Sequence, residues 1–187
     1  TVRAGSKAEM ALPDGTFVHL NAATNLEYDV NNSKQRLVKL SGEAFFDVAK
    51  NPDCPFKVII NDLQIEVVGT SSNVKTYKKD IVETSLLSGR IRISGGSLPH
   101  EYTLSPGQKA TYSAMDRTLR ISKADAHVEA GWRDNYLIFE STPLIDVIAQ
   151  IERWYGVEIR LHHKQIAQDL LSGSFRNESI QNVIRSL

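Results

Sequence analysis

Short apolar segments recur along the first part of the chain at intervals of roughly eight to twelve residues, a spacing that is common in all-β domains. Glycine follows a polar residue or a proline between several of these segments, at Asp14-Gly15, Ser41-Gly42, Ser88-Gly89 and Pro106-Gly107. Such spacing is typical of a β-sandwich, a barrel or a β-solenoid. Because the turns recur without a strict period, the sequence does not establish a regular solenoid. We therefore predict a mainly β N-terminal lobe that is a β-sandwich or β-solenoid-like.

Alternation of apolar and polar side chains predicts where the strands lie. We expect strands at residues 8–12, 16–20, 26–28, 37–40, 44–48, 56–60, 63–68, 74–77, 81–87, 90–94, 102–104, 108–112 and 118–122. The Asp-Gly pair at Asp14-Gly15 predicts a hairpin between the first two strands, since this pair is a strong turn signal between apolar runs. A loop at residues 31–33 is expected to end the third strand.

The pattern changes at residue 137, where a strand leads into an amphipathic helix and then into a further expected strand at 157–161. Thr142 is placed to cap this helix, with Pro143 as its first residue and Gly156 as its C-terminal stop. The apolar side chains of the helix recur with helical periodicity, at Leu144, Ile148, Ile151 and Tyr155. This stripe predicts that the helix packs on a core.

The end of the chain predicts another strand at residues 171–175 and a closing helix capped by Asn177. The apolar residues of that helix are Ile180, Val183, Ile184 and Leu187. The expected order of elements is β-α-β-β-α, a small α/β domain that normally continues into another strand. We therefore expect an unpaired sheet edge there. The domains predicted are an all-β domain at 1–125, a linker at 126–136 anchored by Trp132, and an α/β domain at 137–187.

Composition excludes several classes of protein. The 22 basic residues balance the 22 acidic ones, so no charge excess indicates nucleic acid or an anionic membrane as a partner. No apolar run approaches the roughly 18 residues of a membrane helix. The chain starts without methionine and without a signal peptide, which we interpret as a soluble piece of a longer protein. A single cysteine, Cys54, forms no disulfide within the chain.

Three motifs could suggest a metal, nucleotide or acyl-enzyme site, and each has a simpler interpretation. Adjacent histidines at 162 and 163, with Asp169, point to opposite faces of an extended chain and rarely share an ion. The S-x-x-K match at Ser72 opens a strand, whereas that chemistry needs a helix start. The segments at 69–71 and 95–97 lack the lysine and helix of a phosphate loop. We expect no metal and no cofactor.

Paired carboxylates of the kind that glycosidases use could come from Glu43, Asp47 and Glu83. Glu43 and Asp47 share a face of their strand, but their spacing alone supports no mechanism. We expect solvated or turn-binding carboxylates, no catalytic residue, and a protein that is not an enzyme. A carbohydrate-binding or hydrolytic β-domain remains an alternative, as does a structural assembly module; exposed aromatic residues on one sheet face would favour the first, and stable ring oligomers the second.

Several stretches resemble the periplasmic part of the FecR family of transmembrane anti-sigma regulators. The matching stretches are residues 12–29, 40–58, 67–77, 86–94 and 104–112, and the most specific block contains Gly42-Glu43-Ala44-Phe45-Phe46 and Pro55-Phe56. Residues 139–159, FESTPLIDVIAQIERWYGVEI, are similar to the STN module of secretins and TonB-dependent transducers. A departure is Ser72, where the family often has an aromatic residue.

The resemblance implies a role in cell-surface signalling and transcription regulation. Family members hold an extracytoplasmic-function sigma factor through a cytoplasmic segment, cross the inner membrane once, and sense the signalling domain of a TonB-dependent transducer in the periplasm. This chain matches only the periplasmic part, without the sigma-binding segment and the membrane helix. The Phe-rich β lobe is similar to Bacteroidetes-type versions, whose transducers often import glycans.

Strand edges of the small α/β domain are the expected partner-binding surface, because adding a partner's strand to an open edge is a common recognition mode. The residues predicted to form it are Leu137, Ile138, Phe139, Leu171, Ser172, Gly173, Ser174 and Phe175. Trp154 and Tyr155 lie near the apolar stripe of the helix, so we expect them to pack in the core rather than against a partner.

Overall fold

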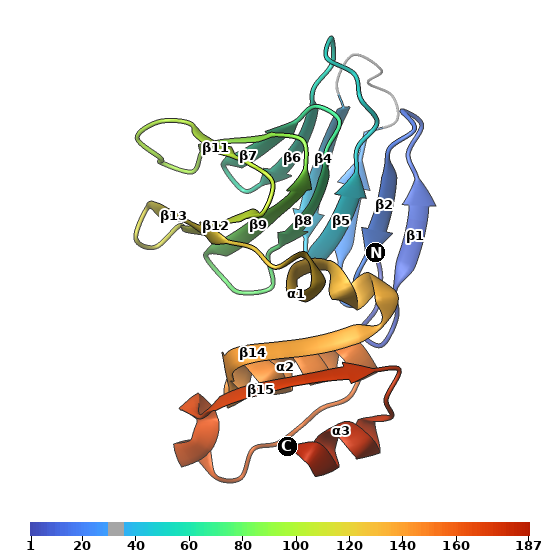
Figure 1. Ribbon diagram of the computed structural model, residues 1–187, viewed down its shortest axis with the longest axis vertical. Helices are drawn as coiled ribbons and strands as arrows, with labels where there is room; N and C mark the ends of the chain where they lie inside the picture. Colours follow the sequence, from blue (N-terminus) through green and yellow to red (C-terminus); the bar gives the residue numbers. More distant parts are fainter. Residues whose placement is uncertain (30–35) are drawn as a thin grey trace.

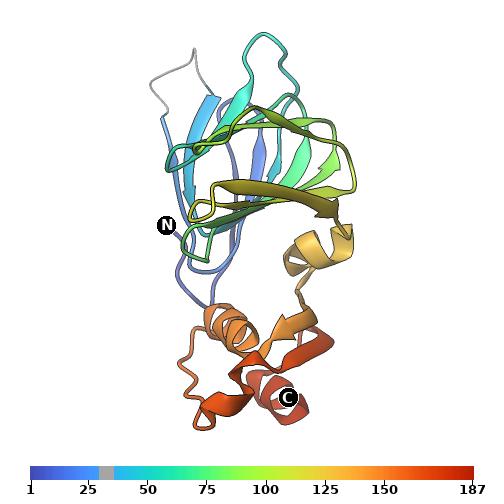
Figure 2. The ribbon, with the colours of Figure 1, turned by 90° about the vertical axis from the view of Figure 1, so that its left-hand side faces the viewer.

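The structure is a computed structural model that describes residues 1–29 and 36–187. The loop expected at residues 31–33 lies outside the described residues. Two β-sheets form two layers of an upper lobe, the β lobe, and a small α/β lobe lies below it (Figures 1 and 2). No helix in the described part of the chain is long and apolar enough to span a membrane.

In the described part of the chain, one sheet of the β lobe has seven strands, in the order β1-β2-β5-β8-β9-β12-β13. Its strands are β1 (Ala8–Ala11), β2 (Phe17–Leu20), β5 (Glu43–Asp47), β8 (Ser71–Lys75), β9 (Ile81–Ser88), β12 (Gln108–Ser113) and β13 (Thr118–Lys123). Neighbouring strands in this sheet are all antiparallel. The hairpin expected around Asp14-Gly15 is confirmed, because β1 and β2 pair with Ala11 opposite Phe17.

The second sheet has six strands among the described residues, in the order β11-β10-β7-β6-β4-β3. Its strands are β3 (Asn25–Tyr28), β4 (Arg36–Ser41), β6 (Phe56–Ile60), β7 (Leu63–Val67), β10 (Ile91–Gly95) and β11 (Tyr102–Leu104). Only the pair β4–β6 is parallel within it. The chain passes repeatedly between the two sheets, so the N-terminal lobe is a mainly β structure of two layers, as expected.

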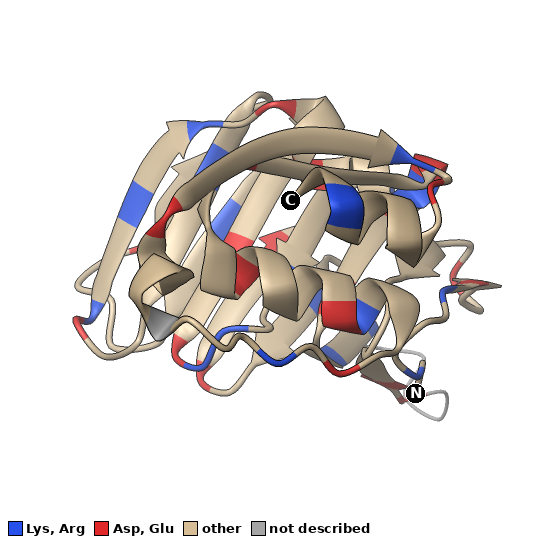
Figure 3. Cartoon of the chain, turned by 90° about the horizontal axis from the view of Figure 1, so that it is seen from below, with Lys and Arg blue, Asp and Glu red and all other residues tan. Residues whose placement is uncertain are grey.

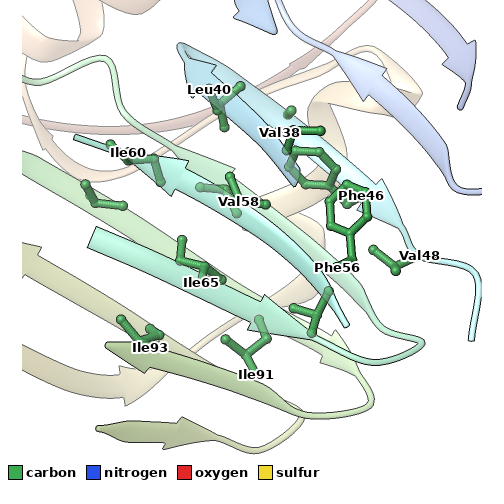
Figure 4. Packing of buried hydrophobic residues seen from close by; sticks show 14 of the residues in the cluster. Val38, Leu40, Phe46, Val48, Phe56, Val58, Ile60, Ile65, Ile91 and Ile93 are labelled. Atoms are coloured by element: carbon green, nitrogen blue, oxygen red, sulfur yellow. The ribbon is translucent and has the colours of Figure 1, made fainter. Parts of the chain in front are cut away.

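The core of the β lobe lies between the two sheets (Figure 4). Alternate residues of each strand face inward and meet there, as the pattern of the sequence predicts. The ring centroids of Phe46 in one sheet and Phe56 in the other are 5.8 Å apart. Fully buried side chains of this size each stabilise the fold by about 1.5–3 kcal/mol. Labelled members of the cluster in Figure 4 include Val38, Val58, Ile65, Ile91 and Ile93.

Two short helices, α1 (Ala126–Ala130) and η1 (Gly131–Asp134), connect the lobes. The C-terminal lobe then contains β14 (Tyr136–Pro143), α2 (Leu144–Tyr155), η2 (Lys164–Gln168), β15 (Leu170–Arg176) and α3 (Ile180–Ser186). Strands β14 and β15 form an antiparallel two-stranded sheet. Its core joins one face of that sheet to α2 and α3, through Leu137, Phe139, Val147, Ile151 and Val183.

The strand expected at residues 157–161 is not present in the structure. The backbone N–H of Ile159 donates to Glu152 Oε1 at 2.7 Å, so a side chain of α2 binds this segment instead of a neighbouring strand. The segment is therefore an irregular connection, and the observed order of the lobe is β-α-β-α.

Neither of the two residues expected to cap a helix does so. Thr142 pairs with Leu171 in the sheet, so α2 begins only at Leu144, after Pro143. Asn177 has a left-handed φ of 52°, and Ser179 caps α3 by accepting a hydrogen bond from the backbone N–H of Asn182. Val183 of the expected α3 stripe is fully buried, but Ile184 and Leu187 are 45% and 43% exposed. The stop at Gly156 is confirmed, with φ 68° and a hydrogen bond to the carbonyl of Glu152.

Candidate functional site

The two lobes meet along a surface that we call the seam. It is formed by residues 1–7, the outer face of β5, β8 and β9, the linker helices, and α2. A cleft of about 350 Å³ lies within it. Residues of both lobes line this cleft, among them Glu43, Lys75, Glu83, Lys109, Asp146 and Arg153.

Glu43 is the buried carboxylate of the seam, with 7% of its surface exposed. Asn21 Nδ2 donates to its Oε2 at 2.7 Å and Asn73 Nδ2 donates to its Oε1 at 2.9 Å. Asn73 Oδ1 in turn accepts a hydrogen bond from Trp132 Nε1 at 3.1 Å. A buried charge is tolerated only when it is hydrogen-bonded in this way, and the bonds connect the sheet to the linker.

Gly42 explains why Glu43 can reach this position. Its φ is 117°, and a Cβ atom there would lie 2.5 Å from Thr24 Oγ1 and 2.7 Å from Thr24 Cα. Only glycine fits such a contact with a neighbouring backbone. The Gly42-Glu43 pair therefore places β5 against the turn before β3, with the carboxylate facing the seam.

Trp132 anchors the linker on the β lobe, which confirms the prediction for this residue. It is 7% exposed and packs with Phe45 of β5 and Ala130 of α1. The guanidinium of Arg133 lies over the Phe45 ring, with Cζ 3.6 Å from the ring centroid. Trp154 of α2 packs against the same cluster, so this aromatic group joins the linker, β5 and α2.

A row of alternating charges crosses the seam from β8 to α1. Lys75 Nζ lies 3.6 Å from Glu83 Oε2, and Lys109 Nζ lies 2.9 Å from both Glu83 Oε1 and Glu129 Oε1. Burial acts to raise the pKa of Glu83, but the two ammonium groups overcome it and the pKa is lowered. Burial acts to lower the pKa of Lys109, but Glu83 and Glu129 raise it.

Helix α2 contacts the turn between β8 and β9. Lys78 Nζ forms an ion pair with Asp146 Oδ2 at 2.6 Å, and Arg153 Cζ lies 4.1 Å from the ring centroid of Tyr77. The Tyr77 hydroxyl donates to the carbonyl of Ala22. Burial, together with the charge of Glu43, raises the pKa of Tyr77, and burial lowers the pKa of Arg153. Tyr77 is therefore neutral where the guanidinium of Arg153 packs on its ring.

Lys7 contacts the linker and the C-terminal lobe at once. Its Nζ donates to the carbonyl of Trp132 at 2.6 Å and to Asn135 Oδ1 at 3.0 Å. It also lies 3.6 Å from the centroid of the Trp154 ring, a cation–π contact. Burial lowers the pKa of Lys7 to about 8, although the charge of Glu43 opposes the shift.

The eight residues predicted to bind a partner lie together in the two-stranded sheet. Leu137 is opposite Phe175, and Phe139 is opposite Gly173. The side chains of Leu137 and Phe139 are buried in the lobe, whereas Ser172 and Ser174 are exposed. Each strand uses one edge to pair with the other, and its outer edge has no ladder partner among residues 1–29 and 36–187.

The other candidate motifs do not assemble into a chemical site. His162 and His163 are exposed, and no group of three potential metal ligands occurs within the described residues. Ser72 is buried in the middle of the seven-stranded sheet and not at a helix start. The expectation of solvated or turn-binding carboxylates is wrong for Glu43, which is buried and accepts hydrogen bonds from Asn21 and Asn73. Asp47 is exposed and accepts a hydrogen bond from Ser71 Oγ at 2.9 Å.

Trp154 and Tyr155 belong to the packed part of α2, as predicted. Both are half-buried against the core of the C-terminal lobe, and the Tyr155 hydroxyl donates to the carbonyl of Glu178 at 2.8 Å. On the face of the molecule seen in Figure 3, basic and acidic residues are interspersed. Sequence reasoning missed Lys7, Tyr77 and Arg153, because their partners are distant in sequence and no local pattern marks them.

Comparison with known proteins places these features in a family. The family model described as FecR protein matches residues 1–92, and the model described as FecR, C-terminal, matches residues 136–187. No curated protein matches the chain. Two crystal structures of a candidate anti-sigma factor from Parabacteroides distasonis ATCC 8503 each have a TM-score of 0.90 and 31% identity. Each comparison covers 100% of this chain and 88% or 87% of the other. The two family models match most of the β lobe, including Gly42 and Glu43, and the C-terminal lobe. The chain therefore belongs to the FecR family.

Proposed function

We propose that this chain is the periplasmic sensor and transmission region of a transmembrane anti-sigma regulator. It receives a signal from the signalling domain of a TonB-dependent outer-membrane transducer and controls an extracytoplasmic-function sigma factor. Membership of the FecR family and the likeness to a candidate anti-sigma factor support the regulatory role. The sigma factor binds a cytoplasmic segment of the whole protein, which the inner membrane anchors. The action is binding and conformational transmission without bond chemistry.

The observation that carries the proposal is the C-terminal sheet, whose two strands each leave an outer edge without a ladder partner in the described chain. Exposed backbone N–H and C=O groups on a strand edge pair readily with another strand. The transducer's signalling domain adds a strand there, over an interface on the order of 800 Å² per partner. Residues 137–187 are then the docking domain, 126–136 the linker, and 1–125 the support.

Charged residues on an edge strand hinder strand addition, which provides a test. Ser172→Lys with Ser174→Lys changes two exposed positions of β15 that lie away from the lobe core. We expect this double variant to bind an isolated transducer signalling domain at least about tenfold more weakly in titration calorimetry, because the charges hinder pairing. Thr118→Lys with Ser122→Lys, on the exposed edge strand β13, is the matched control and should bind normally. Equal affinity of both double variants and the unchanged chain would contradict docking at β15.

A further inference from the structure

Residues 1–7 run from the β lobe to the C-terminal lobe, and we call them the strap. Their first part pairs with the β lobe: Val2 and Thr24 exchange backbone hydrogen bonds of 2.7 and 3.1 Å. Their second part pairs with α2: the N–H of Gly5 donates to the carbonyl of Arg153 at 2.8 Å. That carbonyl is in the last turn of the helix, where carbonyl groups lack a partner within the helix.

Two glycines allow the strap to lie against the end of α2. Gly5 has a φ of +75°, and a Cβ atom there would lie 3.2 Å from the carbonyl oxygen of Tyr155. Gly156 has a φ of +68°, and a Cβ atom there would lie 3.2 Å from the carbonyl oxygen of Ala4. The two backbones thus approach each other through residues without side chains.

Lys7 closes the second part of the strap. Its ammonium group binds Trp132 of η1, Asn135 before β14 and Trp154 of α2, so its three partners come from different places along the C-terminal third of the chain. A movement of α2 away from the β lobe breaks the contacts of Gly5 with Arg153 and of Lys7 with Trp154. It leaves the Val2–Thr24 pair in place, because that pair lies within the β lobe.

We infer that the position of the C-terminal lobe controls whether residues 4–7 stay bound to the end of α2 or are released from it. The strap thereby transmits the position of α2 to the N-terminal end of the chain. This inference rests on the proposed function only for the identity of the signal. By thermodynamic linkage, a partner that binds better when the strap is released also releases the strap. The sandwich core holds only the first part of the strap, through the buried side chain of Val2 and its backbone pairing with Thr24.

Amide hydrogen exchange of the whole chain, resolved by NMR at Val2 and Gly5, tests this inference without any partner. Lys7→Met keeps the length of the side chain but removes the charge that binds Trp132 and Asn135. We expect the Gly5 amide to exchange about tenfold faster, because hydrogen bonds of a charged group are lost. The Val2 amide should change less than about twofold, since its pairing lies within the β lobe. Lys123→Met, at an exposed lysine of β13, is the control and should change neither amide.

A second variant acts from the other side of the contact. Gly156→Ala places a methyl group against Ala4, and we expect it also to accelerate exchange at Gly5. Gly107→Ala has the same left-handed strain, with φ +79°, but nothing within 4 Å of the added Cβ atom. It should leave Gly5 unchanged. Unaltered exchange at Gly5 in both Lys7→Met and Gly156→Ala would overturn the strap.

An isolated transducer signalling domain, added to the unchanged chain, separates this inference from the proposed function. Faster exchange at Gly5 in the variants without binding of the signalling domain supports the strap and contradicts the proposed function. Binding of the domain with no change at Gly5 contradicts the coupling and leaves the docking intact. Binding accompanied by faster exchange at Gly5 supports both.

Discussion

The two lobes differ in how much core they contain. The β lobe buries one continuous cluster between two sheets, with Phe46, Phe56, Ile65, Ile91 and Leu104 each at most 1% exposed. Among the described residues, the core cluster of the C-terminal lobe is smaller and lies under a two-stranded sheet; its buried members are Leu137, Phe139, Val147, Ile151 and Val183. Small cores are marginally stable, and regions that move are found at the low-stability end of a structure. The comparison indicates a rigid support that carries a weaker, more responsive lobe.

The largest effect is expected from removing a ring at the centre of the sandwich. Phe56→Ala deletes a fully buried side chain that contacts Phe46, and we expect it to lower the free energy of unfolding by about 3–5 kcal/mol. Urea denaturation followed by circular dichroism measures this change. Met115→Ala, at a side chain that is 79% exposed, is the control and should be nearly neutral. A cost below about 1 kcal/mol for Phe56→Ala would show that the sandwich core is not the rigid support.

A smaller and more local effect is expected in the C-terminal lobe. Ile151→Ala removes a fully buried side chain of α2, and we expect it to lower the free energy of unfolding of the C-terminal lobe by about 2–5 kcal/mol. The stability of the β lobe should change little. Hydrogen exchange should therefore become faster in β14, α2, β15 and α3 while β4, β6 and β7 keep their protection. If all these strands and helices lost protection together, the lobes would form one cooperative unit and the comparison would be wrong.

The smallest effect is the pH dependence of the charge row in the seam. Since the pKa of folded Glu83 lies below its usual value of 4.5, its ion pairs stabilise the fold above pH 4.5 and this stability is lost as pH falls through the folded pKa. Lys109 has a raised pKa, so its contribution is complete below pH 10.5 and is lost as pH rises above it. Urea midpoints between pH 3 and 7 should fall less steeply for Glu83→Gln. Glu27→Gln, at an exposed position of β3, is the control and should follow the unchanged chain.

The regular parts of both lobes could be predicted from the sequence because their signals are local. Alternation places the strands, and the 3.6-residue period places α2 and its end at Gly156. The start of β8 was missed, since Ser72 and Asn73 are polar residues that the surrounding sheet buries. Thr142 and Asn177 have the right chemistry for helix caps, but strand pairing and a left-handed turn use them differently.

The seam could not be predicted, because its contacts join residues that are far apart in the sequence. Lys7 and Trp132 are separated by 125 positions, and Asn73 and Trp132 by 59. The sequence shows Glu43 as a candidate carboxylate, but only the folded chain brings Asn21 and Asn73 to its oxygens. The expected strand at 157–161 is absent for a related reason, since the side chain of Glu152 on α2 accepts the hydrogen bond from the backbone N–H of Ile159.

Both tryptophans of the chain, Trp132 and Trp154, lie at the seam, and the sandwich core contains none. The tryptophan fluorescence of this chain therefore arises where the lobes meet. The indole of Trp132 donates to Asn73 of the β lobe, whereas the indole of Trp154 on α2 lies under the Lys7 ammonium and packs against the Trp132 cluster. Separation of the lobes changes the surroundings of the Trp154 indole. The chain thus carries its own optical reporter of lobe separation, and stopped-flow emission follows that event without any added label.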